Sequence, residues 1–243
     1  MLTGPREWWA SCGNARLGRI QRAARFADRS AEWKDSMRLA IFGGTGGTGL
    51  ELTRQALEKG HSVRVLVRNP NRMPLTNQNM RLVLGNVLEQ ESVTKTVLGT
   101  DAVLSCLGQR SLVRNTRVVS AGTRLIMEVM KAQGVRRLVV ESAFGAGESL
   151  AQANAIGRLL FATLLWAPYQ DKNAMEPEVK ASGLDWTILR PTLLTNGALT
   201  GRFVVSTGRP AANRVSRADV AAAMLRAVEE RLWVGEAPAV TGA

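Results

Sequence analysis

The sequence predicts an α/β fold, in which a doubly wound parallel sheet carries helices on both faces. Apolar runs of strand length alternate with amphipathic helical patterns from Met37 onward, and a glycine-rich turn joins the first strand to the first helix. The chain of 243 residues is long enough for one such domain. Alternation of this kind produces βαβ units with right-handed crossovers, and ligands then bind beyond the carboxyl ends of the strands.

The glycine-rich turn lies within 39–50, where an apolar strand passes directly into a helical pattern. Two dinucleotide fingerprints fit at once, Gly44-x-Gly46-x-x-Gly49 and the wider Gly43-x-x-Gly46-x-x-Gly49. Glycine permits a tight turn and lets backbone N–H groups approach a pyrophosphate at the positive helix N-terminus. A glycine turn that binds nothing is the alternative, but strand, turn and helix follow in the order of a Rossmann-type domain. The expected cofactor-binding residues here are Gly43, Thr45, Gly46, Gly47, Thr48 and Gly49.

The other elements follow in order along the chain. Strands are expected at 38–42, 62–67, 81–84, 101–107, 136–142, 185–189 and 202–206, and helices at about 48–59, 90–98, 116–133, 170–182 and from Ser216, where Ser-x-x-Asp resembles a capping box. We expect 37–243 to be a single NAD(P)-binding domain with a small substrate-side region at about 143–169 and 190–215. Within it the apolar segment Gly157–Ala167 is interpreted as a lid or pocket wall, or as a buried core helix; it has about half of the roughly 20 residues that a membrane helix needs.

Residues 1–36 differ in composition from the rest of the chain. They contain three of the six tryptophans and show no sustained hydrophobic period. Because Met37 directly precedes the first strand, we interpret this segment as a disordered or non-native N-terminal extension. Its acidic residues argue against a transit peptide, and it lacks the apolar stretch of a secretory signal.

Two arginines follow the second strand, where an NAD-preferring site would have an acidic residue for the ribose 2′-OH. Arg68 ends that strand and Arg72 comes four residues later. A carboxylate would repel the 2′-phosphate of NADP, whereas guanidinium groups form charge-assisted bonds to it. We therefore interpret Arg68 and Arg72 as selectors for NADP, the alternative being two solvated loop arginines.

Three further strand ends lie where the cofactor should run. Asn86 and Val87 follow the third strand and are expected near the adenine. Leu107, Gly108 and Arg110 follow the fourth strand, on the nicotinamide side, and Ser142 ends the fifth strand beside the expected position of hydride transfer. Each of these segments is a loop of no function in the alternative interpretation.

Charge and cysteine content exclude several classes of function. The net charge is +12, but the basic residues are scattered and form no recognised nucleic-acid module, so we expect no specific nucleic-acid partner. Cys12 and Cys106 are far apart, which favours free thiols and a cytoplasmic location. His61 is the only histidine, so a histidine metal cluster is excluded, and we expect His61 in a surface turn.

Six motifs together resemble a known family. They are Gly43–Gly49, Val65–Arg68, Gly85–Val87, Ser142–Phe144, Ser182–Pro191 and Ser216–Val220. From about Met37 to Val240 the chain resembles the atypical short-chain dehydrogenase/reductases of the NAD(P)H-binding, NmrA-like type. Within them it is most similar to the flavin reductases (NADPH), also called biliverdin-IXβ reductases.

The resemblance implies roles for individual residues. It implies that the cofactor phosphates lie on the glycine turn, that Arg68 and Arg72 hold the 2′-phosphate, that Arg110 lies near the cofactor, and that Ser142 lies beside the nicotinamide. Three residues depart from the reductase pattern. Lys172 and Leu193 stand where those reductases have histidines around the substrate, and Asn86 replaces an aspartate, so the resemblance is more specific for the cofactor than for the acceptor.

Ordinary short-chain dehydrogenases use Tyr-x-x-x-Lys, in which lysine lowers the pKa of a proton-donating tyrosine. Tyr169 precedes Lys172 by only three positions, so both remain secondary catalytic candidates behind Ser142. We expect an NADPH-dependent oxidoreductase that passes hydride to a planar small-molecule acceptor, a flavin, and that is a monomer or homodimer without a membrane partner. The alternative is a non-catalytic NADP(H)-binding sensor or scaffold protein.

Overall fold

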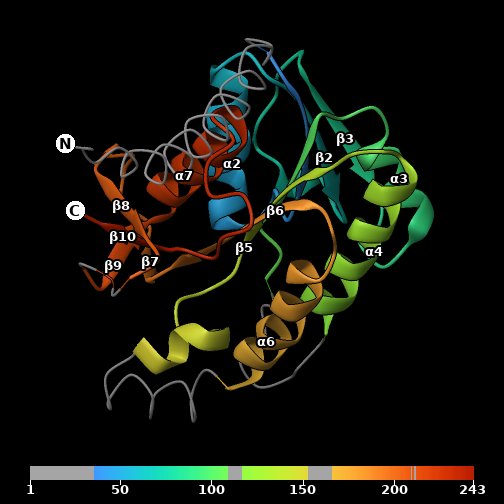
Figure 1. Cartoon of the computed structure of the whole chain (residues 1–243). Helices are drawn as coiled ribbons and strands as arrows, with labels where there is room; N and C mark the ends of the chain where they lie inside the picture. The colour runs from blue at the N-terminus through green and yellow to red at the C-terminus, as the bar shows by residue number, and fades with distance from the viewer. Residues whose placement is uncertain (1–35, 109–116, 153–165, 209, 211) are drawn as a thin grey trace, which may run out of the picture. The chain divides into compact units, whose positions relative to one another are not determined.

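The computed structural model describes residues 36–108, 117–152, 166–208, 210 and 212–243, in which strands and helices alternate as predicted (Figure 1). Ser36–Ala243 forms one compact unit. The extension predicted for 1–36 lies outside the described residues apart from Ser36, and so does most of the apolar segment Gly157–Ala167. The lid expected in that segment therefore stays a prediction.

The centre of the fold is an eight-stranded sheet with the order β3-β2-β1-β4-β5-β6-β10-β8. All neighbours are parallel except β10 and β8, which are antiparallel. The strands are β1 Arg38–Phe42, β2 Ser62–Val67, β3 Met80–Leu84, β4 Ala102–Ser105, β5 Arg137–Glu141, β6 Asp185–Pro191, β8 Phe203–Ser206 and β10 Ala239–Gly242. The chain moves outward from β1 in one direction to β3 and then in the other from β4, so the sheet is doubly wound, with its switch point between β1 and β4.

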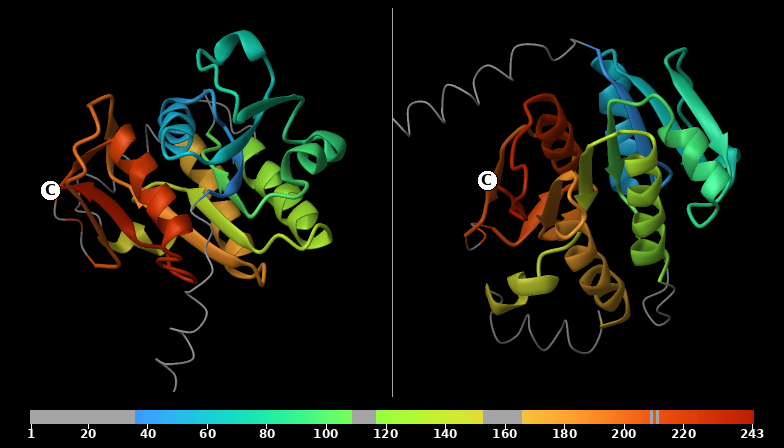
Figure 2. Two further views of the ribbon diagram at one scale, coloured as in Figure 1. Left: turned by 90° about the horizontal axis from the view of Figure 1, so that it is seen from above. Right: turned by 45° about the vertical axis from the view of Figure 1, so that its right-hand side comes forward.

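Helices cover both faces of this sheet, as predicted (Figure 2). On one face α2 (Gly47–Glu58) packs against α7 (Arg217–Glu229), and on the other lie α3 (Gln90–Val97), α4 (Val118–Ala132) and α6 (Trp166–Lys180). Two short 3₁₀ turns, η1 Pro70–Arg72 and η2 Gly147–Gln152, lie in connections. Strands sandwiched in this way are apolar on both sides, and all of Leu39, Ala40, Ile41 and Phe42 are fully buried.

Three short strands were not expected from the sequence. A second sheet pairs β7 (Leu193–Thr195) with β9 (Arg214–Ser216), and β10 extends the main sheet beside β6. Each has only three or four residues, too few to show a hydrophobic period. They form because partners from distant parts of the chain supply their hydrogen bonds. β7, β8 and the start of β9 fall within the predicted substrate-side region at about 190–215, whereas β10 lies outside it.

The expectation that His61 lies in a surface turn was wrong. Its side chain is buried, its Nδ1 accepts the backbone N–H of Met37 at 3.1 Å, and its Nε2 lies 2.8 Å from Oε1 of Glu229. Glu229 also binds Lys59. The last turn of α7 therefore covers the histidine, which joins the starts of β1 and β2 to that helix.

Candidate cofactor-binding and active site

The glycine turn leaves space that side chains would fill. Gly43 has a φ of +78°, and a Cβ atom there would collide with the carbonyl oxygen of Cys106. A Cβ atom on Gly49 would collide with the carbonyl oxygen of Gly43, while the N–H of Gly46 donates to that same oxygen at 2.9 Å. Glycine at these positions therefore allows β1, the turn and α2 to approach closely, as the fingerprint requires.

The turn presents free backbone donors to an anion. Gly46 is the N-cap of α2 without a side-chain cap, and the first turn of the helix contains no acidic residue. By contrast, α4 begins beyond β4, and Asp171 already accepts the backbone N–H groups of Val119 and Ser120 there. Of these two helix N-termini beside the switch point, that of α2 is the one that fits the pyrophosphate of a dinucleotide.

On the side where the adenosine is expected, the structure brings the predicted residues to one end of the sheet. Arg68 and Arg72 are both exposed, and neither forms a salt bridge with a described acid. Asn86 Oδ1 accepts the N–H of Leu88, and Val87 is buried against Gly122 of α4. Both arginines are thus available for a phosphate group, whereas Val87 is a packing residue at the rim of the site.

At the ends of β4 and β5 a buried polar cluster lies behind the glycine turn. Thr48 Oγ1 donates to Glu141 Oε1 at 2.9 Å, and Cys106 also contacts the Glu141 carboxyl. Burial raises the pKa of Glu141, while the charge of Lys172 and the Thr48 hydrogen bond act in the opposite direction. Burial also raises the pKa of Cys106, so that thiol is not an activated nucleophile.

The Ser142 hydroxyl forms a hydrogen bond with a member of a buried ion pair. Ser142 is buried, and its Oγ donates to Glu176 Oε1 at 2.6 Å. Glu176 in turn pairs with Arg190 at 2.5 Å, and both of these side chains are almost fully buried. Ser142 therefore joins β5 to α6 and β6, and its predicted place beside the nicotinamide stays a prediction.

Tyr169 and Lys172 each bind a different stretch of backbone. The Tyr169 hydroxyl donates to the carbonyl oxygen of Phe144 at 2.7 Å, and burial raises the pKa of this tyrosine to about 12. Lys172 Nζ donates to the carbonyl oxygens of Glu141 and Ser142 at 3.1 and 2.8 Å, and burial lowers its pKa against the charge of Glu141. A tyrosine with a raised pKa is the opposite of the activated tyrosine of ordinary short-chain dehydrogenases.

Two predicted residues lie at the switch point, one lies outside the described residues, and some functional candidates were missed. Leu107 and Gly108 belong to the start of the connection after β4, where the backbone of Leu107 lies close to Gly43, whereas Arg110 lies outside the described residues. Sequence reasoning did not single out Glu141, Glu176 or Arg217. Glu141 was visible as an acid at a strand end, but its contact with Thr48 joins residues 93 positions apart.

Two other kinds of site find no support in the part of the chain that the structure describes. No group of three His, Cys, Asp or Glu side chains there could hold a metal ion. None of the helices described is long and apolar enough to cross a membrane.

Comparison with known proteins decides the family. Residues 43–231 match the family described as NAD(P)H-binding, a span that includes the glycine turn and all of α7. The chain belongs to the NAD(P)H-binding family. This membership confirms the family and the cofactor class predicted from the motifs. The glycine turn with Gly43, Gly46 and Gly49, called the glycine cradle below, fits that cofactor's pyrophosphate.

The curated relatives of this NAD(P)H-binding chain include an assembly factor and a reductase. Photosystem II assembly factor Ycf39 of Synechocystis sp. is 27% identical over 173 residues, covering 70% of this chain and 48% of that protein. Phenylcoumaran benzylic ether reductase POP1 of Populus trichocarpa is 24% identical over 189 residues, covering 74% of this chain and 55% of that protein. The chain thus spans about half the length of these two curated relatives.

A solved structure has the same fold. The anaerobilin reductase ChuY from Escherichia coli O157:H7 superposes with a TM-score of 0.72 and 20% identity, covering 84% of this chain and 97% of that one. At this level of identity the likeness shows the Rossmann-type fold, as predicted.

Proposed function

We propose that this protein is an NADPH-dependent oxidoreductase that reduces a planar acceptor, and that the acceptor is a flavin. The observation behind the proposal is that the two candidate hydroxyl groups, Ser142 after β5 and Tyr169 on α6, are already hydrogen-bonded within the protein. Ser142 donates to Glu176, and Tyr169 donates to the carbonyl of Phe144 with its pKa raised to about 12. A flavin accepts hydride at N5 and needs no strong acid from the protein, so it suits a site of this kind.

The preference for NADPH over NADH rests on charge. Arg68 and Arg72 stand after β2 without a salt bridge to a described acid, where a carboxylate would select the unphosphorylated ribose. The free N–H groups of the α2 N-terminus would hold the pyrophosphate, and Lys172 would lie on the nicotinamide side at the end of β5. When bound, the dihydronicotinamide supplies the hydride, and the protein supplies position and charge.

The relatives support reduction as the reaction class without naming the substrate. One relative is named a phenylcoumaran benzylic ether reductase and one solved structure an anaerobilin reductase, but their substrates are their own. The absence of a histidine counterpart at Lys172 and Leu193 favours flavin over tetrapyrrole here. Leu193 is exposed on β7 and offers apolar surface to an aromatic ring.

A second candidate function is a non-catalytic NADP(H) sensor or scaffold. One observation favours it: the match to an assembly factor, Ycf39, over 70% of this chain. Both functions would use the same glycine cradle, so the fold does not separate them.

Steady-state oxidation of NADPH separates the two functions. Purified protein is assayed with FMN, riboflavin, a quinone and a tetrapyrrole, and we expect turnover with the flavins. Gly46→Val, which places a branched side chain in the cradle, should abolish that turnover without lowering the melting temperature by more than a few degrees. Binding of NADPH without turnover of any acceptor would replace the oxidoreductase proposal with the sensor.

A further inference from the structure

Arg217 lies directly over the phosphate-binding turn, although it comes from the other end of the chain. A Cβ atom added to Gly47 would lie 2.5 Å from Cδ and 2.8 Å from Nε of Arg217. Gly47 is the first residue of α2, and Arg217 is the first residue of α7, which packs against α2. The guanidinium group is therefore beside the free N–H groups that fit the pyrophosphate.

The charge of Arg217 is not neutralised by a direct ion pair. Its Nη1 donates to the side-chain oxygen of Asn196 at 2.6 Å, a neutral acceptor, and no salt bridge joins it to a described acid. It is close enough to Glu141 for its charge to lower the pKa of that carboxyl, although burial of Glu141 has the larger, opposite effect. A half-buried guanidinium with a neutral partner keeps its capacity to bind an anion.

The start of α7 holds this arginine in place. Ser216 Oγ accepts the N–H of Asp219 at 3.0 Å and so caps the helix. The Asp219 carboxylate accepts the N–H groups of Thr200 and Gly201, both at 2.9 Å, which fixes the loop that follows Asn196. Asp219 thus connects the first turn of α7, which begins at Arg217, to residues 200 and 201 in the loop that contains Asn196.

We propose that Arg217 is a cofactor-binding residue that holds the pyrophosphate together with the adjacent α2 N-terminus, with Asn196 as its positioning residue. The pyrophosphate would contact both the positive end of α2 and the guanidinium group beside it. This role differs from that of Arg68 and Arg72, which would recognise the 2′-phosphate at the far end of the adenosine. It concerns cofactor binding alone and holds whichever acceptor is reduced.

The test compares three ligands by calorimetry: NADPH, NADH and adenosine 2′-monophosphate, which has no pyrophosphate. Arg217→Gln should raise the Kd of NADPH and of NADH by the same factor, about 10-fold or more for a lost charged hydrogen bond. Its effect on adenosine 2′-monophosphate should be less than about 2-fold. Asn196→Ala should give a smaller increase for both dinucleotides, and Arg217→Lys should restore part of the affinity.

Arg226→Gln is the matched control, because Arg226 lies on the same helix and pairs with Glu230 at 3.0 Å on the exposed side. It should leave all three dissociation constants unchanged. The proposal is overturned if Arg217→Gln lowers the melting temperature but not dinucleotide affinity, which indicates a structural role. It is also overturned if all three ligands weaken alike, or if only the KM of FMN rises while that of riboflavin does not, which places the acceptor's phosphate there instead.

Discussion

The carboxyl group of Glu141 lies behind the phosphate-binding turn, within 2.9 Å of the Thr48 hydroxyl. Burial raises its pKa, so part of the protein carries it in the neutral form at a pH where an exposed glutamate is ionised. An ionised carboxylate here would repel the pyrophosphate. We expect NADPH affinity to fall as pH rises through the raised pKa, and Glu141→Gln to remove that dependence.

The raised pKa of Glu141 also makes the free energy of unfolding depend on pH. Because the pKa of Glu141 is raised in the folded state, its contribution to the free energy of unfolding is fully present below the ordinary glutamate pKa. That contribution is lost as pH rises through the raised value. Urea unfolding of wild type and Glu141→Gln across this range tests the effect on stability, and calorimetry of NADPH across the same range tests the effect on binding, with the exposed Glu230→Gln as control. An identical pH profile of NADPH binding in wild type and Glu141→Gln contradicts the assignment.

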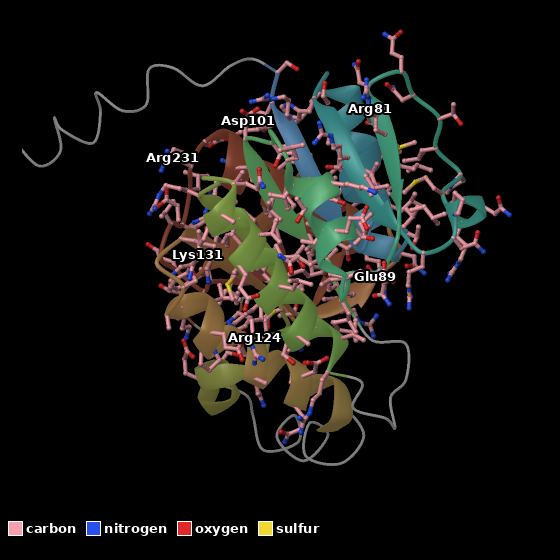
Figure 3. The ribbon with its side chains drawn as sticks, turned by 90° about the vertical axis from the view of Figure 1, so that its right-hand side faces the viewer. Arg81, Glu89, Asp101, Arg124, Lys131 and Arg231 are labelled. Atoms are coloured by element: carbon pink, nitrogen blue, oxygen red, sulfur yellow. The ribbon has the colours of Figure 1, made fainter. Side chains whose placement is uncertain are left out.

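Cofactor preference depends on two exposed arginines. Replacing Arg68 and Arg72 together by glutamine should weaken the binding of NADPH by about 1.5 to 3 kcal/mol for each charged hydrogen bond lost. The binding of NADH should hardly change. Arg81→Gln is the control, since Arg81 is an exposed arginine on the edge strand β3 (Figure 3). Equal affinity of the unaltered protein for NADH and NADPH would rule out the selector role.

Ser142→Ala separates positioning from proton donation. If the Ser142 hydroxyl only orders the buried Glu176–Arg190 pair, kcat with a flavin should fall about 10-fold and NADPH affinity should stay nearly unchanged. An obligatory proton donor would instead cost about 10²- to 10⁴-fold, with a rate that follows its pKa. Ser149→Ala is the control, because Ser149 has a buried hydroxyl that is hydrogen-bonded to the backbone of Gly145 and Ala146.

At the scale of elements, one buried carboxylate connects α7 to the loop after β7. Asp219 accepts hydrogen bonds from Ser216, Thr200 and Gly201, and it is 2% exposed. Asp219→Ala should lower the free energy of unfolding by at least about 1.5 to 3 kcal/mol, because it leaves buried donors without an acceptor. Urea denaturation measures this loss, and a change below about 0.5 kcal/mol would contradict it.

Local patterns predicted the long strands and helices because each has a periodicity of its own. The strand at 38–42 and the helix that follows it were recognisable from apolar runs and glycines alone. The strands β7, β9 and β10 were missed because pairing with distant strands creates them. The Ser-x-x-Asp start of α7 was correctly read as a cap, yet the hydrogen bonds of Asp219 to residues 200 and 201 were not foreseeable.

The candidate site also has one part that local sequence predicts and another that depends on contacts between distant residues. The glycine cradle lies in one continuous stretch, so its geometry follows from local sequence. Glu141, Glu176 and Arg217 act through contacts with residues far away in the chain, and no local spacing marks them. His61 was misplaced for this reason, because its partner Glu229 is 168 residues later.

At the scale of the whole molecule, Ser36–Ala243 is compact by itself. A protein that begins at Met37 should therefore fold, bind NADPH and melt within a few degrees of the full chain. Its new amino group would still lie beside His61, which accepts the N–H of Met37. Circular dichroism and calorimetry of both proteins test this, and insolubility of the shortened one would show that residues 1–36 stabilise the domain.

The position of Arg217 over Gly47 has a consequence for the newly made protein. These two residues are 170 positions apart, so at about 5 to 20 residues per second the ribosome makes Arg217 roughly 10 to 30 seconds after Gly47. During that interval the chain lacks Arg217, so the proposed contact of this residue with the pyrophosphate cannot form. The cellular supply of NADPH would then act on the finished chain, by mass action, and a cell short of the cofactor would retain less of this protein.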